Sequence, residues 1–339
     1  MIEEILSSFS QVAPPDDAFR QRVAQQLSQE RNATAAPGSL GDLQKAALWF
    51  AACHGSSAPL AVKQVRLLIV AGDHGASHEH PEISTLPADF PSDTFRVIQS
   101  GDAPIVDACR SAGVSLDIVD ANLNRPTADV STHDAMSAED FSSYLEQGYN
   151  LANEEADSGT DLVVLGDAGR GLTTVAAGVI ATICSVEPVK AVGRGSGIDD
   201  DAWRTKVAVM RDAMYRVRDD RGDPSRVLRR IGSPDLVVMA SFLAQCAVRR
   251  TPVLVDGLGS LAAALCAHMM APGAGAWWMV ASQSGEPTHR HALKALHATP
   301  LLQMNLCNGL GAAGVMAVPL LEHACRLMNA KLGNGGGAD

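Results

Sequence analysis

Residues 161–183 read DLVVLGDAGRGLTTVAAGVIATI, and this stretch decides the fold. An apolar run of strand length passes into glycines, and two threonines then precede a long Ala-rich apolar segment. That order is typical of a β-strand, a tight turn and an α-helix. Similar units recur through the middle of the chain, and such alternation predicts helices on both faces of a parallel sheet. The sequence therefore predicts an α/β fold with a doubly wound, mostly parallel sheet.

Seven short apolar runs fit the strands of this sheet. Most of them end in a polar residue or in glycine, and open α/β sheets bind ligands outside the carboxyl ends of their strands. We therefore expect the functional site at that edge. The predicted strands are Val65–Ala71, Val114–Asp120, Asp161–Gly166, Val189–Gly193, Asp235–Ala240, Pro252–Asp256 and Ala276–Ala281.

The composition argues against several classes of protein. The 339 residues carry 27 Lys and Arg against 38 Asp and Glu. The formal net charge of −11, without a basic patch, argues against nucleic acid as a partner. The seven cysteines form no CxxC pair and predict reduced thiols. No segment fits a secretory signal or a membrane span, so we expect a cytoplasmic protein with no membrane partner.

The first glycine-rich turn, Gly166–Thr174, is a candidate anion site. Glycines leave backbone amides accessible, a helix N-terminus carries partial positive charge, and Thr173 and Thr174 add hydroxyls. Such a combination suits a phosphate or a carboxylate. The alternative is a tight strand-to-helix turn that a threonine caps.

A second turn of the same kind, Gly193–Gly197, follows a predicted strand and precedes a predicted helix. Two neighbouring anion sites suggest a nucleoside monophosphate as ligand. The spacing is neither GxGxxG nor GxxxxGK[ST], so an NAD-dependent oxidoreductase and a P-loop nucleotide site are disfavoured. The acidic pair that holds magnesium in pyrophosphate-dependent sugar transferases is absent as well.

Both ends of the chain predict helices and no strand. Pro37 and Gly38 interrupt the N-terminal helices, and we expect Ser39 to cap the next one. Residues 1–60 and 309–331 are expected to form a small helical subdomain. Residues 61–308 are expected to form a Rossmann-like α/β nucleotide-binding domain, and residues 332–339 a disordered tail.

Histidines cluster in the segment Asp73–Glu82, together with three carboxylates. Such side chains can ligate a metal, but the helical HExxH spacing is absent. An Asp-His pair at a strand end more often orients a loop or a substrate, so we predict no metal site. We expect His289, His291 and His297 to lie on a solvated helix face.

Taken in order, the motifs of the chain resemble those of the nicotinate-nucleotide:dimethylbenzimidazole phosphoribosyltransferases, which make the nucleoside phosphate of the lower ligand of cobalamin. Each motif is modest alone, but together they are specific and cover roughly residues 36–330. They are Pro37–Gly41, Asp73–Gly75, Gly166–Thr174, Gly193–Gly197, Pro252–Gly257, Ser284–Pro287, and Gly309–Gly311 leading to Pro319 and Glu322.

The resemblance implies a reaction that needs neither metal nor cofactor. A nitrogen of the base attacks the anomeric carbon of nicotinate mononucleotide, nicotinate leaves, and a general base takes the proton of the incoming imidazole. The 5′-phosphate is expected on the two glycine turns. The predicted nucleotide and phosphate ligands are Gly166, Gly169, Gly171, Thr173, Thr174, Gly193, Arg194, Gly195, Ser196, Lys206 and Ser284.

The residues expected to bind and deprotonate the acceptor base depart from the family pattern. Counting from the flanking prolines puts Leu310 where the family has its general-base Glu, and leucine cannot accept a proton. Leu86 and Thr94 fall where the family has Ser and Gln, and Asp167 falls on the Glu of its Gly-Glu loop. Asp167 is therefore the candidate catalytic residue. The predicted acceptor pocket consists of Asp73, His74, Leu86, Thr94, Asn308 and Leu310.

This mixture of kept and changed residues leaves three functions open. The chain is an active transferase that uses Asp167 or the His-rich segment as base, a non-catalytic subunit paired with a Glu-bearing paralog, or a binding or regulatory protein for nicotinate mononucleotide. We expect phosphoribosyl transfer to an aromatic base in cobalamin biosynthesis. The resemblance also implies a homodimer, with the Ala-rich stretch Leu261–Met270 available for packing between subunits.

Overall fold

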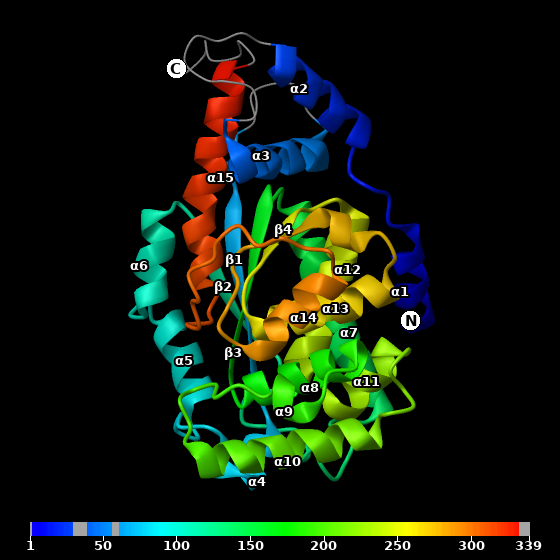
Figure 1. The fold of residues 1–339 in the computed structure, drawn as a ribbon. Coiled ribbons are helices and arrows are strands. Elements are labelled where there is room, and N and C mark those ends of the chain that lie inside the picture. Colours follow the sequence, from blue (N-terminus) through cyan, green and yellow to red (C-terminus); the bar gives the residue numbers. More distant parts are fainter. Residues whose placement is uncertain (1, 30–38, 56–60, 332–339) are drawn as a thin grey trace.

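A computed structural model describes residues 2–29, 39–55 and 61–331 (Figure 1). Its five strands form one sheet in the order β2-β1-β3-β4-β5, and every neighbouring pair is parallel. The α/β class and the parallel sheet flanked by helices are thus confirmed. The strands are β1 (Val65–Asp73), β2 (Ser115–Asp120), β3 (Leu162–Arg170), β4 (Val253–Val255) and β5 (Trp278–Val280).

The strand order reverses between β1 and β3. The chain passes from β1 to β2 on one side and then returns to add β3 on the other side. In doubly wound sheets a ligand crevice forms at such a switch point, outside the carboxyl ends of the strands. Here those ends are Asp73 and Arg170, which pair directly in the register of the two strands.

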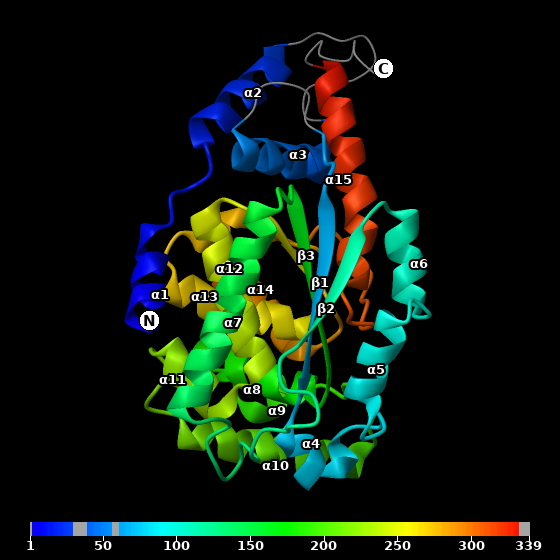
Figure 2. The ribbon, with the colours of Figure 1, turned by 180° about the vertical axis from the view of Figure 1, so that it is seen from behind.

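Side chains of β1 alternate between two hydrophobic cores because successive residues of a strand point to opposite faces. Leu68 and Val70 belong to one core, whereas Leu67 and Ile69 belong to the other. Helices therefore cover both faces of the sheet, as Figures 1 and 2 show from opposite sides. A parallel sheet that is buried on both faces explains the continuous apolar runs of its strands.

The larger group of helices lies on the face of Leu68 and Val70. Its most extensive contact joins α7 (Ala138–Asp157) to α12 (Pro234–Arg249). Gly148 lets these two helices approach, because an added Cβ there would lie 2.1 Å from the carbonyl oxygen of Val238. The other helices of this group are α8 (Leu172–Cys184), α11 (Pro224–Ile231), α13 (Leu258–Met270) and α14 (Pro287–Ala295).

On the opposite face lie α3 (Gly41–His54), α5 (Phe90–Gln99), α6 (Pro104–Ser111) and α15 (Ala312–Lys331). At one end of the molecule α2 (Asp17–Gln29) lies against α3, and α3 contacts α15, whereas α1 (Ile2–Ser8) contacts α7 (Figures 1 and 2). The division into a helical subdomain and a main domain stays a prediction. The predicted tail, residues 332–339, lies outside the described residues.

Short helices complete the fold. The loop after β1 contains α4 (Gly75–Glu79) and the 3-10 helix η2 (Pro81–Ile83), and α9 (Pro188–Ala191) precedes α10 (Asp200–Arg216). Two more 3-10 turns are η1 (Phe9–Gln11) and η3 (Ala274–Trp277). The N-cap of α3 is Leu40, so the expected cap at Ser39 is wrong by one residue.

Two of the seven predicted strands are wrong. Asp235–Ala240 lies inside α12, where it is completely buried, and a helix that is buried on all sides has the same continuous apolar pattern as a buried strand. Val189–Gly193 forms most of α9 and a loop, with Pro188 at the first turn of the helix. The apolar run alone could not distinguish these states.

The suggestion that Leu261–Met270 packs between subunits is also wrong for most of that stretch. From Leu261 to Ala267 every side chain is buried in the chain's own core, within α13. Small residues there serve close packing inside the chain instead.

Candidate active site

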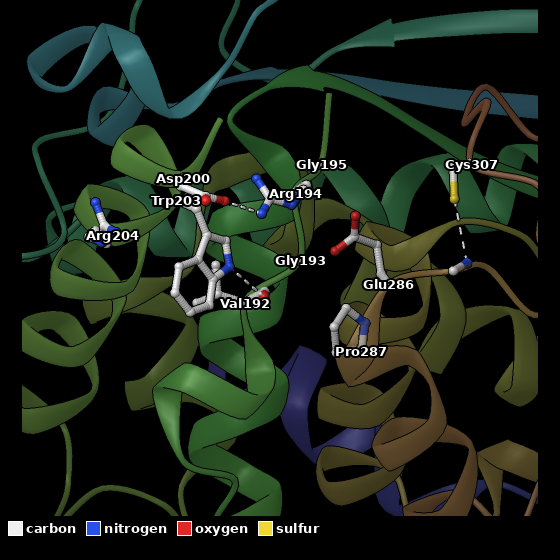
Figure 3. A pocket seen from close by; sticks show the side chains of 11 residues that line it. Val192, Gly193, Arg194, Gly195, Asp200, Trp203, Arg204, Glu286, Pro287 and Cys307 are labelled. Atoms are coloured by element: carbon white, nitrogen blue, oxygen red, sulfur yellow. Dashed lines mark hydrogen bonds and ion pairs between the residues drawn. The ribbon is translucent and has the colours of Figure 1, made fainter. Parts of the chain in front are cut away.

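A pocket of about 690 Å³ opens beside the second glycine turn (Figure 3). Its walls come from this turn, from the start of α10 and from the segment that leads into α14. The volume lies in the range of small-molecule sites. The lining residues are Val192, Gly193, Arg194, Gly195, Asp200, Trp203, Arg204, Gly285, Glu286, Pro287 and Cys307.

The glycines of this turn leave space for charged side chains. A Cβ at Gly193 would lie 2.1 Å from Oε2 of Glu286, and a Cβ at Gly195 would lie 2.9 Å from Nζ of Lys206. Gly195 also has a φ of +51°, which favours glycine. The turn follows the helix α9 and not a strand, which corrects its predicted context, although α10 does begin at its far end as expected.

Lys206 is a buried cation behind Gly195. Its ammonium donates a hydrogen bond of 3.1 Å to Oγ1 of Thr173, and no carboxylate of the described residues lies within 4.0 Å of it. Burial lowers the pKa of Lys206, an effect that the charge of Glu286 partly offsets. The buried Oγ1 of Thr174 has no hydrogen-bond partner in the described part of the chain. An anionic ligand beside Gly195 would supply the opposite charge that Lys206 lacks among the described residues.

Ser284 lies next to the lining residue Gly285 and contacts His289. Its hydroxyl donates a hydrogen bond of 2.8 Å to Nδ1 of His289, and its backbone N–H points to the same nitrogen. Burial lowers the pKa of His289 to about 4, so this imidazole is neutral at physiological pH. The expected solvated helix face therefore holds for His291, which is exposed on α14. It is wrong for His289, which is buried on the same helix, and for His297, which is exposed but lies beyond the end of α14.

Asp167 lies inside β3, paired with Val70 of β1. The residues Gly166–Arg170 are thus strand, and the predicted first turn is confined to Gly171 and the start of α8. The Oδ2 atom of Asp167 accepts hydrogen bonds from the backbone N–H and the hydroxyl of Ser260, at 2.9 and 3.0 Å. Burial, helped by the charges of Asp256 and Asp235, raises the pKa of Asp167 to about 6 against the lowering effect of these bonds.

The loop Gly309–Gly311 lies over β3 at this point. All three of its residues have positive φ angles, of 66°, 58° and 69°, which is uncommon for leucine. The N–H of Leu310 donates a hydrogen bond of 3.0 Å to the carbonyl oxygen of Asp167. Gly166 is needed for this contact, because a Cβ there would lie 2.5 Å from the backbone nitrogen of Gly311.

Asp256 anchors the end of the same loop. Its Oδ2 atom accepts hydrogen bonds from the N–H groups of Ala313 and Gly314 in the first turn of α15, at 2.9 and 3.1 Å. Its other oxygen accepts a bond from Ser282. A carboxylate at a helix N-terminus stabilises the helix, so Asp256 fixes where the loop ends.

The histidines of the loop after β1 face three different carboxylates. His74 is buried between Asp235 at 3.3 Å and the carbonyl oxygen of Arg170 at 2.9 Å, while His78 contacts Asp73 and His80 contacts Asp129. Burial opposes the charged form of His74, but Asp235, together with the Arg170 carbonyl and Asp73, outweighs this effect and the pKa of His74 is raised. In the described ranges no three such side chains come together as metal ligands.

The remaining predicted residues lie outside the lining of the pocket. Asn308 is exposed beside Cys307, Leu86 lies on the loop after β1, and Thr94 is half-buried on α5. Ser196 makes two hydrogen bonds with Thr85. Of the predicted set, only Gly193, Arg194 and Gly195 line the pocket, with Thr173 and Lys206 directly behind them.

Sequence reasoning missed several residues of the site. Glu286 points into the pocket toward Gly193 (Figure 3), and its buried Oε2 has no partner in the described part of the chain. Trp203 forms a wall, held by a hydrogen bond from its indole N–H to the carbonyl oxygen of Val192. Glu286 stands in the motif Ser284–Pro287, so a carboxylate beside a predicted phosphate ligand was the signal that could have identified it.

Comparison with known proteins gives consistent matches over almost the whole chain. The family model described as Phosphoribosyltransferase matches residues 12–332. A nicotinate-nucleotide–dimethylbenzimidazole phosphoribosyltransferase of Corynebacterium glutamicum is 39% identical over 95% of this chain and 91% of its own length. One of Mycobacterium avium is 38% identical over 93% of both chains.

The chain belongs to this phosphoribosyltransferase family. Among solved structures, the nicotinate-nucleotide-dimethylbenzimidazole phosphoribosyltransferase of Thermus thermophilus superimposes with a TM-score of 0.85 at 27% identity. The match covers 95% of this phosphoribosyltransferase and 100% of the Thermus chain. Within the described residues of the chain no helix is long and apolar enough to cross a membrane.

Proposed function

We propose that this phosphoribosyltransferase transfers the ribose phosphate of nicotinate mononucleotide to a dimethylbenzimidazole-like base in cobalamin biosynthesis. Membership of the family supports the reaction class, and relatives that carry the substrates in their names match along almost the whole chain. The comparisons do not favour the alternative of a non-catalytic partner or regulator.

One observation supports the binding of nicotinate mononucleotide in this proposal. The ammonium of Lys206 is buried behind Gly195, and it has no carboxylate partner among the described residues. A buried charge is costly unless an opposite charge or hydrogen bonds compensate it. The 5′-phosphate of the mononucleotide supplies such a charge. Thr173, Thr174 and the amides of Gly193–Gly197 are the further phosphate ligands in this proposal, and Ser284 stands beside them.

The chemical step breaks one bond and forms one. The acceptor nitrogen attacks the anomeric carbon, the bond from that carbon to the pyridinium nitrogen breaks, and the electron pair goes to nicotinate as it leaves. Cleavage discharges the positive nitrogen, so the leaving group needs no proton. The acceptor must lose its own N–H proton, and Asp167 takes it in this proposal, since a carboxylate with a pKa of about 6 is ionised at neutral pH and is a better base than an ordinary one.

The His-rich segment is a weaker candidate for this base. Both ring nitrogens of His74 already have partners, Asp235 and the carbonyl oxygen of Arg170, in a fully buried environment. Asp167 keeps Oδ1 outside its hydrogen bonds with Ser260. The changed residue at the family's base position, Leu310, is thus compatible with turnover in this proposal.

The deciding experiment mixes the purified chain with nicotinate mononucleotide and dimethylbenzimidazole and follows nicotinate and the α-linked nucleotide by chromatography. We expect equal amounts of both products from the chain alone. Binding of the mononucleotide without turnover would support the non-catalytic alternative. Sedimentation of the same sample tests the predicted homodimer, and the cytoplasmic location also stays a prediction.

A further inference from the structure

Arg170 is the last residue of β3, and its guanidinium is almost completely buried. All three of its nitrogens donate to backbone carbonyl oxygens of the loop after β1. Nε donates to Leu86 at 2.8 Å, one terminal nitrogen donates to Pro81 at 2.9 Å, and the other donates to Ser77. One side chain thus contacts three points of this loop, spread over the ten residues 77–86.

This arrangement does not include an ion pair. In the described ranges no carboxylate lies within 4.0 Å of the guanidinium. The three carbonyl oxygens therefore stabilise its buried positive charge. A buried cation is costly without such bonds, which means that the loop conformation and the arginine depend on each other.

The backbone of Arg170 also contacts the loop after β1. Its carbonyl oxygen accepts hydrogen bonds from His74 at 2.9 Å and from the Ser77 hydroxyl at 3.2 Å. The flanking glycines permit this approach, because a Cβ at Gly169 would lie 2.6 Å from His74 and one at Gly171 would lie 2.8 Å from Ser77. The loop therefore packs on β3 through both the main chain and the side chain of residue 170.

The loop after β1 also forms hydrogen bonds with the turn Gly193–Gly197 of the pocket. The N–H of Thr85 donates a hydrogen bond of 2.8 Å to Oγ of Ser196, and Oγ1 of Thr85 donates one of 2.7 Å to the carbonyl oxygen of Ser196. Thr85 is the neighbour of Leu86, whose carbonyl oxygen Arg170 holds. Hydrogen bonds and the peptide bond between Thr85 and Leu86 thus connect the switch point of the sheet to the turn Gly193–Gly197.

We propose that Arg170 is a positioning residue that fixes the glycine turn for nicotinate mononucleotide through Leu86, Thr85 and Ser196. The ligand part of this inference rests on the proposed function, whereas the mechanical part does not. Arg170 does not contact the ligand in this arrangement, because all its nitrogens point to the loop.

Hydrogen exchange of the full chain without ligand tests the mechanical part. In Arg170→Met we expect exchange of the Thr85 and Gly197 amides to accelerate about tenfold or more, while the Val255 amide in β4 stays protected. Equal acceleration at all three amides would indicate global destabilisation and overturn the proposal, as would unchanged exchange at Thr85. Arg110→Met is the matched control, since Arg110 is an exposed arginine on α6.

Calorimetry with nicotinate mononucleotide tests the ligand part through a double-mutant cycle. We expect Arg170→Met and Thr85→Val each to weaken binding, by about tenfold for the arginine, and the double variant to bind no more weakly than Arg170→Met. Additive losses, or wild-type affinity in Arg170→Met, would count against the path. If the wild-type chain gives no heat, the proposed function fails, and the exchange data alone decide the role of Arg170.

Discussion

The backbone N–H of Leu310 donates a 3.0 Å hydrogen bond to the carbonyl oxygen of Asp167. The two residues are 143 positions apart in the sequence, yet the contact joins the loop at the family's expected base position to the carboxylate that we propose as base. Three consecutive positive φ angles hold the loop in this place, and Asp256 fixes its end. In the proposed mechanism the proton of the acceptor therefore goes to a carboxylate of β3 that lies against this loop.

Replacement of Asp167 tests its role as base. We expect Asp167→Asn to lower kcat by about 10²–10⁴-fold, which is typical for loss of a positioned general base, and to leave the affinity for nicotinate mononucleotide within about threefold. Steady-state kinetics and calorimetry measure the two effects. Equal loss of affinity and of kcat would instead indicate a role in donor binding.

The pH profile gives an independent check of the same residue. Because the pKa of Asp167 is raised to about 6, we expect kcat to rise with pH through about 6 and then to level off. The hydroxyl of Ser260 lowers this pKa, so Ser260→Ala is expected to move the inflection to higher pH. An inflection that Ser260→Ala leaves in place would assign the titration to another group.

The buried Asp167 also affects stability. Its pKa is higher in the folded state than in the unfolded state, so the folded state binds the proton more tightly, and its stability falls as pH rises from about 4 to above 6. Asp167→Asn removes this dependence, and we expect it to raise the free energy of unfolding at pH 8 by up to about 3 kcal/mol relative to pH 4. Urea unfolding of the wild-type chain and of Asp167→Asn at both pH values measures the difference. An equal change in the free energy of unfolding at pH 4 and at pH 8 would contradict the raised pKa of Asp167.

Lys206 is expected to bind the donor phosphate. Lys206→Met keeps a side chain of similar length without its charge, and we expect about 100-fold weaker binding of nicotinate mononucleotide, because a charge-assisted contact is lost. Lys190→Met is the matched control, since Lys190 is exposed and pairs with Glu187 on the surface. Calorimetry at two salt concentrations measures the affinity of each variant for nicotinate mononucleotide. Similar affinities of Lys206→Met and Lys190→Met would show that Lys206 does not bind the phosphate.

Two glycines with positive φ allow backbone strain to be separated from crowding of the site. A Cβ at Gly195 would approach Lys206 and Thr173 to less than 3.0 Å, whereas a Cβ at Gly197 would meet nothing within 4 Å. We expect Gly195→Ala to weaken donor binding at least tenfold, and Gly197→Ala to show only the strain, of about 1 kcal/mol in stability. Equal effects on binding would mean that conformation alone matters in this turn.

Restoring a carboxylate at the loop tests the meaning of Leu310. We expect Leu310→Glu to increase transfer to dimethylbenzimidazole at least tenfold over the wild-type chain, because a second base stands where the family pattern has one. Leu310→Gln has nearly the same shape without the base and is expected to give no gain. A product assay of both variants decides between them, and a gain in both would indicate a change of pocket shape.

The alternation of apolar runs, glycine turns and Ala-rich segments sufficed to predict the parallel sheet, because each of these patterns is local. The apolar runs at β1 and β3 predict these two strands directly. The family resemblance predicts Lys206 as a phosphate ligand, and that role stays a prediction. At Asp235–Ala240 the sequence predicts a strand and the structure has a helix, because a fully buried helix and a fully buried strand share the same continuous apolar pattern.

Sequence alone thus determined the fold class and the family, since these follow from residues close together in the chain or from ordered motifs. Tertiary structure decided what each of these residues touches. Asp167 has a raised pKa because burial removes it from water near Asp256, and Arg170 holds Ser77, Pro81 and Leu86 because β1 and β3 are neighbours in the sheet. Burial and hydrogen-bond partners depend on segments that only the folded chain brings together, so no local pattern encodes them.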